Sequence, residues 1–246
     1  MQSVLSIRYS IFSFSGWKNI TLFFLLSYFQ LESFLKLCFV PLFYQQHINE
    51  RTRLAIWKIE ERESFFEMGI PLKREITHPH KRLQHFAGRF LLPLLFPDFP
   101  NHEIEIADTR QPFLPGEQYH FSISHCADFA AALVSSQYRV GIDVETMNPK
   151  VEQIKHKFLH PTELDFVHAH HLDEQPELLS IAWSAKEAMY KWYGHGQVDF
   201  SEMMRLEPFK LSNEGIIDAT FKKPDFEQST RIHYKLFEQL VLAWIV

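Results

Sequence analysis

The chain has 246 residues, 24 of them Phe, and a formal net charge of −5. This length allows one large domain or two small ones, and either can bury a substantial core. The acidic balance argues against general nucleic-acid binding, which requires a surface rich in Lys and Arg. Only two cysteines occur, Cys38 and Cys126, far apart and outside any metal-ligand spacing. We therefore expect no disulfide scaffold and a protein of the reducing cytoplasm.

Residues 1–39 differ from the rest of the chain and contain an apolar run over 20–29. This run is about half as long as a membrane-spanning helix. A targeting segment is an alternative, because Arg8 and Lys18 precede the run, but no small-residue cleavage site follows it. We expect an extension outside the fold, a domain that begins near Val40, and no membrane partner.

The first half of that domain mixes strand and helix signals. In chain order, the pattern predicts a strand over 54–59, a short helix from Glu63 to Met68, a helix over 80–92, and strands over 103–107, 121–125 and 129–134. The helix over 80–92 has an apolar stripe and is bounded by Pro79 and Pro93, which favour helix ends. The last two strands are predicted to form a hairpin.

The second half repeats this order. The pattern predicts a strand over 140–145, helices over 151–158, after Pro161 and over 177–193, and strands over 216–221, 231–237 and 240–246. The long helix should stop at Gly194. Because strand, helix and strands occur in this order twice, we predict an α+β protein with an N-terminal half over 40–138 and a C-terminal half over 139–246.

The strand over 140–145 carries two candidate metal ligands, Asp143 and Glu145. Residues two apart in a strand point to the same side, so the two carboxylates should lie together. A solvated strand edge is the alternative, since charges usually face water. Asp143, however, lies in an apolar run behind Gly141, where an unpaired carboxylate is costly unless it binds a cation.

A second group of polar side chains lies on the predicted helix over 177–193. Trp183, Glu187, Tyr190 and Lys191 are spaced by three and four residues and share one helical face, with Lys186 beside them. A simple surface ion pair between Glu187 and Lys191 is the alternative. Together with the strand carboxylates, Glu187 completes an oxygen donor set of the kind that Mg²⁺ prefers while it keeps positions for water and phosphate.

Two further signals have simpler readings. His168, His170 and His171 lack a helical i, i+4 pair and neighbouring cysteines, so a solvated helix end is favoured over a zinc site. Ser124 and His125 are adjacent strand residues that point to opposite faces, which disfavours a Ser-His hydrolase. Hydrogen bonds from this pair to a phosphate are the preferred interpretation.

Three motifs, in this order along the chain, resemble those of one enzyme family. They are F-S-I-S-H at 121–125, G-I-D-V-E at 141–145 and W-S-A-K-E-A-M-Y-K at 183–191. The chain resembles the 4′-phosphopantetheinyl transferases, specifically the surfactin-synthetase-activating type, over about residues 40–246. The resemblance implies a monomer of two similar α+β halves related by a pseudo-twofold axis, with coenzyme A in the cleft between them.

The resemblance also implies roles for individual residues. The Mg²⁺ ligands, facing the pyrophosphate of coenzyme A, would be Asp143, Glu145 and Glu187. The phosphates would contact Lys186 and Lys191. The 3′-phosphoadenosine end would contact Ser124, His125 and Arg89. The general base would be Glu163. The family reads Gly-Lys-Pro where this chain has Arg110-Gln111-Pro112, so Arg110 would have to replace the missing lysine.

The implied reaction is the transfer of 4′-phosphopantetheine from coenzyme A to a serine of an apo-carrier protein, with release of 3′,5′-ADP. Catalysis of phosphoryl-type transfer consists mainly of positioning and charge stabilisation, which fits a site of carboxylates, lysines and Mg²⁺. Two alternatives stay open. One is a relative that binds coenzyme A or a carrier protein without catalysis, and the other is a metal-dependent phosphohydrolase.

Overall fold

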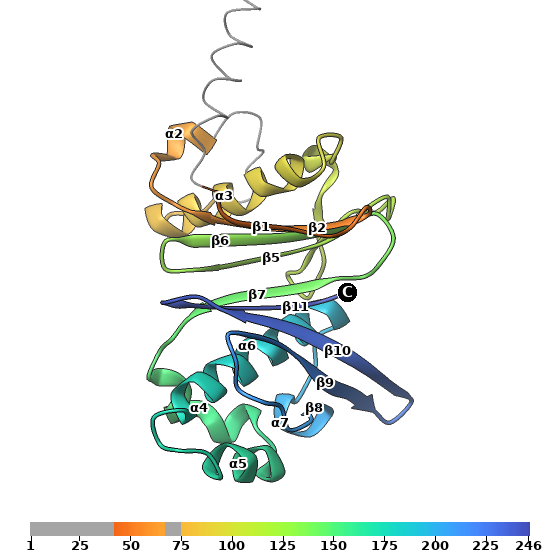
Figure 1. Ribbon diagram of the computed structural model, residues 1–246. Coiled ribbons are helices and arrows are strands. Elements are labelled where there is room, and N and C mark those ends of the chain that lie inside the picture. The colour runs from red at the N-terminus through yellow and green to blue at the C-terminus, as the bar shows by residue number, and fades with distance from the viewer. Residues whose placement is uncertain (1–41, 67–74) are drawn as a thin grey trace, which may run out of the picture. The chain divides into compact units, whose positions relative to one another are not determined.

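Two large antiparallel β-sheets, a short two-stranded sheet and associated helices make up the computed structural model, which describes residues 42–66 and 75–246 (Figure 1). The predicted extension over 1–39 and the predicted end of a short helix at Met68 lie outside the described residues. None of the helices in the described part of the chain is long and apolar enough to cross a membrane.

The first sheet has four strands in the order β1-β2-β6-β5. Their bounds are Leu42–Asn49, Thr52–Lys58, Phe129–Ser135 and His120–Cys126, in that order. Helix α3, Pro79–Leu95, packs against this sheet, and the short helix α2, Glu63–Phe66, packs against α3. The hairpin of β5 and β6 confirms the predicted pair of strands. Strand β1 was not predicted, because its residues alternate between half-buried and exposed and form no apolar run.

Helix α3 continues two residues beyond Pro93, where the sequence predicted its end. A proline inside a helix leaves the carbonyl four residues earlier without its N–H donor. Here that carbonyl belongs to Arg89, and it accepts a hydrogen bond from the Asn101 side-chain amide at 3.1 Å. The Phe96 N–H still donates to the Leu92 carbonyl at 3.0 Å. A side chain from the next element therefore replaces the bond that Pro93 removes.

The second sheet has five strands in the order β7-β11-β10-β9-β8. Their bounds are Gly141–Thr146, Leu240–Ile245, Phe226–Leu236, Glu214–Lys223 and Met204–Leu206, in that order. The associated helices are α4 Lys150–Phe158, α5 Pro161–His168, α6 Gln175–Tyr193 and α7 Phe200–Met203. Gly194 ends α6 with φ of 81°, as the sequence predicted. The short elements α7 and β8 were not predicted.

The predicted strand over 103–107 is largely wrong. Residues Asn101–Glu103 form a 3₁₀ turn, and only β3, Glu105–Ile106, pairs with the equally short β4, Pro112–Phe113. Both residues of β3 are exposed. The alternating pattern therefore lacks the buried face that would extend the strand.

Both sheets contain the same connection. In each, one strand is followed by at least one helix and then by a hairpin. The second strand of that hairpin pairs with the strand that precedes the helix. The spatial orders are β2-β6-β5 around α3 and β7-β11-β10 around α6. The α+β class is confirmed, whereas the pseudo-twofold axis and the division at residue 138 stay predictions. The described residues, 42–66 and 75–246, belong to one compact unit.

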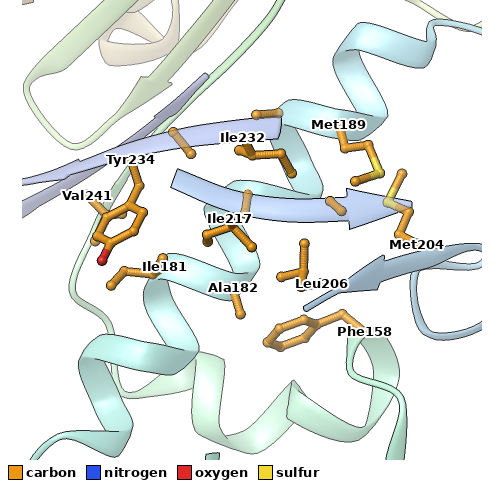
Figure 2. Packing of buried hydrophobic residues seen from close by; sticks show 14 of the residues in the cluster. Phe158, Ile181, Ala182, Met189, Met204, Leu206, Ile217, Ile232, Tyr234 and Val241 are labelled. Carbon is orange, nitrogen blue, oxygen red and sulfur yellow. The ribbon is translucent and has the colours of Figure 1, made fainter. Parts of the chain in front are cut away.

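Two hydrophobic clusters hold these layers together. One lies between α6 and the second sheet and includes Ile181, Met189, Ile217 and Ile232 (Figure 2). The other lies between the two sheets and joins side chains such as Leu54 and Leu133 to Ile142, Val144 and Leu242. Because alternate residues of β7 contribute to the second cluster, the residues between them are turned toward α6.

Candidate functional site

Close packing of α6 on β7 forms the floor of the candidate site. At Gly141 an added Cβ atom would lie 2.0 Å from the Ala188 carbonyl oxygen and 2.7 Å from the Trp192 nitrogen. Only glycine allows this approach. Asp143 and Glu145 follow on the same side of β7, and α6 brings Glu187 and Lys191 toward them, one turn apart.

Asp143 is the centre of a hydrogen-bonded triangle. Its Oδ1 atom accepts from Ser124 Oγ at 2.8 Å and from Lys191 Nζ at 2.7 Å, and Lys191 Nζ also donates to Ser124 Oγ at 2.8 Å. The side chain is nearly fully buried. Its second oxygen, Oδ2, is buried and has no hydrogen-bond partner among the described residues. A buried oxygen without a donor is costly, so this atom is suited to a ligand or cation.

The three carboxylates influence one another electrostatically. Burial raises the pKa of Glu187 to about 7; the Lys191 charge opposes this rise, and the charges of Asp143 and Glu145 add to it. Burial also raises the pKa of Glu145, and the charge of Asp143 adds to that effect. The cluster therefore resists holding three negative charges at neutral pH without a compensating cation.

The donor chemistry of this cluster fits Mg²⁺, which binds carboxylate oxygens and retains positions for water and phosphate. The unpartnered Asp143 Oδ2 and the raised pKa values of Glu145 and Glu187 are the observations that support this fit. In the described residues, however, no three His, Cys, Asp or Glu side chains are arranged as a ready metal cluster. The assignment of Mg²⁺ is therefore a proposal.

The histidines over 168–171 show contacts typical of a helix end. His170 Nδ1 lies 2.9 Å from the Phe166 carbonyl oxygen, and His168 Nε2 lies 3.2 Å from Lys155 Nζ. These are local contacts and do not bring the rings together around a common point.

Ser124 and His125 lie on opposite faces of β5, as the sequence predicted: Ser124 is buried and His125 is exposed. The Ser124 hydroxyl is engaged with Asp143 and Lys191, and the neighbouring Ser122 hydroxyl accepts from the Ile142 N–H at 3.1 Å. Ser124 therefore ties β5 to β7, whereas its expected contact with a nucleotide stays a prediction. Although His125 is exposed, partial desolvation of its ring lowers its pKa, and the nearby Lys191 charge adds to this effect.

Lys186, which was expected to contact phosphate, lies in the core, and its expected role stays a prediction. The side chain is fully buried, and its Nζ donates to Glu163 Oε2 at 2.6 Å. The backbone carbonyl oxygens of Phe158, Phe200 and Met204 lie 2.7 Å, 3.1 Å and 2.9 Å from the same Nζ, so its three N–H groups are shared among four acceptors. Residues one position apart on a helix do not share a face, so Lys186 points away from Glu187.

Glu163, the expected general base, belongs to the same buried network, and that role stays a prediction. Its Oε2 atom accepts from Lys186 and from the His160 N–H at 2.7 Å, the latter as part of a capping box for α5. Its Oε1 atom accepts from the Leu206 N–H at 2.8 Å. Both oxygens are engaged and the residue is buried. Glu163 and Lys186 thus form an internal ion pair that joins α5, α6 and β8.

The two arginines expected near the nucleotide lie on different elements. Arg89 is on α3, and burial lowers its pKa to about 10. Within the described residues, its guanidinium group makes no hydrogen bond or ion pair. Arg110 has φ of 67° in the loop before β4 and lines a cavity of 200 Å³ together with Lys191. Neither arginine is joined to Asp143 by a hydrogen bond or ion pair, so both assignments stay predictions.

A contact that the sequence did not predict lies beside this cavity. The Gln111 side-chain amide donates to the Lys191 carbonyl at 2.6 Å. Gln111 and Lys191 line both the 200 Å³ cavity and a neighbouring cavity of 290 Å³. The sequence marked Gln111 only as a departure from a family pattern, and no local signal revealed its partner 80 residues later.

Comparisons with known proteins give one consistent result. Residues 139–245 match the sequence profile of the 4′-phosphopantetheinyl transferase superfamily. A 4′-phosphopantetheinyl transferase of Bacillus subtilis is 36% identical over 92 residues, which are 37% of this chain and 41% of the relative. Enterobactin synthase component D of Salmonella austin is 31% identical over 149 residues, 57% of this chain and 56% of the relative.

The third relative is the 4′-phosphopantetheinyl transferase Sfp of Bacillus subtilis strain 168, 30% identical over 149 residues, 56% of this chain and 65% of the relative. The chain thus spans about half the length of the curated relatives it matches. The segment over 139–245 contains the three carboxylates and Lys191. By its sequence, this segment is a match to the 4′-phosphopantetheinyl transferase superfamily.

Proposed function

We propose that this chain transfers the 4′-phosphopantetheine group of coenzyme A to a serine hydroxyl of an apo-carrier protein and releases 3′,5′-ADP. The observation that carries the proposal is the buried Asp143 carboxylate, which pairs with Lys191, keeps one oxygen unpartnered and adds to the effect of burial in raising the pKa of Glu145 and Glu187. The similarity to named transferases supports it. The motif over 183–191 further supports the surfactin-synthetase-activating type.

Asp143, Glu145 and Glu187 would hold Mg²⁺. When bound, the cation would neutralise negative charge on the pyrophosphate oxygens of coenzyme A. Lys191 provides a fixed positive charge beside the same position, because Asp143 and Ser124 hold its ammonium group. A preorganised charge of this kind stabilises charge that develops during transfer, and it needs no rearrangement. The nucleophile belongs to the carrier protein.

A binding protein without catalysis is the second candidate. The observation that favours it is the fixed Lys191 ammonium group beside a cavity of 200 Å³, which can hold a phosphate without catalysis. Such a protein would need Lys191 and the cavity beside it, but not three mutually repelling carboxylates. We therefore favour the transferase, acting as a cytoplasmic monomer.

Intact-mass measurement of a carrier protein separates these functions. The protein is incubated with Mg²⁺, coenzyme A and apo-carrier proteins from fatty-acid, polyketide and peptide synthesis. A mass gain of one phosphopantetheine group supports transfer. Free phosphopantetheine without a modified carrier indicates a phosphohydrolase, and an unchanged carrier with bound coenzyme A indicates a binding protein.

A matched pair of variants shows whether the carboxylate cluster is responsible. Asp143→Asn removes the charge at the centre of the cluster. Asp128→Asn removes an exposed carboxylate that pairs with His80 at 2.9 Å. Transfer that survives Asp143→Asn as fully as Asp128→Asn would refute the site proposed here.

A further inference from the structure

The loop between β3 and β4 is a tight turn that faces the C-terminal end of α6. The Arg110 N–H donates to the Ala107 carbonyl at 2.8 Å, and the Ala107 N–H donates to the Gln111 carbonyl at 2.9 Å. Arg110 adopts the left-handed region, with φ of 67°. These two bonds close the loop at its base and place Gln111 at its end.

Gln111 reaches from this loop to the last turn of α6. Its Nε2 atom donates to the Lys191 carbonyl at 2.6 Å. The last four carbonyls of a helix lack donors within the helix, so this bond satisfies an acceptor that the helix leaves open. The same amide packs against Gly194, where an added Cβ atom would lie 3.1 Å from Gln111 Oε1. Thr109 Oγ1 adds a long contact of 3.5 Å to the Gly194 carbonyl.

Lys191 is therefore held at both of its ends. Gln111 binds its backbone carbonyl, while Asp143 and Ser124 bind its ammonium group. We propose that Gln111 is a positioning residue that fixes the last turn of α6, so that Lys191 presents its charge to a phosphate-bearing substrate beside Asp143. The substrate in this inference rests on the proposed function, whereas the holding of α6 does not.

Direct contact between Gln111 and the substrate is the competing explanation, because Gln111 lines both cavities beside Lys191. Exchange measured without ligand on two variants separates the explanations. Gln111→Met keeps the length of the side chain but has no donor. Gln111→Lys restores a donor, and its charge suits a helix C-terminus. Gln118→Met is the matched control, because in the part of the chain that the structure describes the exposed Gln118 amide donates only to Glu103.

The first measurement is hydrogen–deuterium exchange of the amides over 190–194 without any ligand. A neutral hydrogen bond corresponds to a change of about 2- to 10-fold in an opening equilibrium. We expect Gln111→Met to accelerate exchange by about that factor, and Gln111→Lys and Gln118→Met to leave it close to wild type. Unchanged exchange in Gln111→Met would overturn the proposal. This holds even if the variant binds coenzyme A more weakly, because that result would indicate direct contact with the substrate.

The second measurement is the dissociation constant of coenzyme A with Mg²⁺, by calorimetry. Gln111→Met should raise it by about fivefold, the equivalent of one hydrogen bond, and Gln111→Lys should restore it. The KM for the carrier protein should stay within about twofold, and an equal rise in both constants would overturn positioning at Lys191. Wild-type protein that does not bind coenzyme A refutes the proposed function, while faster exchange in Gln111→Met still supports the holding of α6.

Discussion

Replacing Lys186 by Met should destabilise the fold far more than it changes the chemistry of the site. Met retains most of the apolar stem, but the Glu163 carboxylate then stays buried without its cation. Removing one partner of a buried ion pair costs about 3–5 kcal/mol. Three backbone carbonyls also lose their donor, so we expect the upper part of this range. For a domain of this size the melting temperature should fall by about 6–20 °C.

Urea denaturation followed by tryptophan fluorescence measures this loss as a free energy of unfolding. The double variant Lys186→Met with Glu163→Gln tests the cause, because Gln carries no charge and still offers one acceptor to the Leu206 N–H. We expect the double variant to be more stable than Lys186→Met alone by at least about 1 kcal/mol, since residues in contact couple. Lys222→Met is the surface control and should change stability little, because the Lys222–Glu227 pair is exposed.

Two results would refute this reasoning. The first is a Lys186→Met variant whose stability lies within about 1 kcal/mol of wild type, a loss no larger than that expected for a surface pair. The second is a variant of wild-type stability that no longer transfers phosphopantetheine, which would return Lys186 to the reaction site.

Three further predictions concern the carboxylate cluster. The folded-state pKa of Glu187 of about 7 lies above its ordinary value of 4.5, so the stability that protonated Glu187 contributes is present below pH 4.5 and lost as the pH rises through 7. In urea denaturation without metal, the wild type should therefore lose about 1–3 kcal/mol relative to Glu187→Gln between pH 5 and 8. Equal pH dependence of the two free energies of unfolding would contradict this. Coenzyme A at about 100 times its dissociation constant should stabilise the fold by roughly 2.7 kcal/mol with Mg²⁺ and much less with EDTA. In a thermal-shift assay, Asp143→Ala should abolish this difference. Equal shifts of the wild type with and without metal would refute the metal site. Ser124→Ala should cost about 1–2 kcal/mol in urea denaturation, because the hydroxyl joins Asp143 to Lys191, while unchanged stability would show that the triangle contributes nothing.

The elements that carry the site were predictable because their sequence signals are long or sharply bounded. The strand predicted over 140–145 is observed as Gly141–Thr146, and the helix predicted over 177–193 as Gln175–Tyr193. A left-handed glycine ends that helix, as the sequence indicated. Strand β1 and strand β8 could not be predicted, because their pairing depends on neighbours that are distant in sequence or on very few residues.

The residues of the site were predictable only where the spacing of residues along a helix or strand determines which way their side chains point. Spacing places Glu187 and Lys191 one turn apart on α6, and the structure brings Lys191 to Asp143. Lys186 does not lie beside Lys191, because five helical positions separate them and Lys186 enters the core. The engagement of Glu163 could not be foreseen, since its partners come from α6 and β8.

Helix α6 contributes side chains both to the hydrophobic core and to the candidate site. Its residues must therefore be separated into those that stabilise the fold and those that indicate function. Trp183 packs against Phe158 and Phe200, with ring centroids 5.1 Å and 6.0 Å apart, and Lys186 satisfies buried acceptors. A protein with no activity would need both residues for stability alone. Asp143 and Glu187 differ, because an unpartnered buried oxygen and a carboxylate with a raised pKa both oppose folding. Groups that cost stability where a ligand can reach them are the stronger sign of a binding or catalytic site. The case for phosphopantetheine transfer therefore rests on these carboxylates and Lys191 more than on the motif that surrounds them.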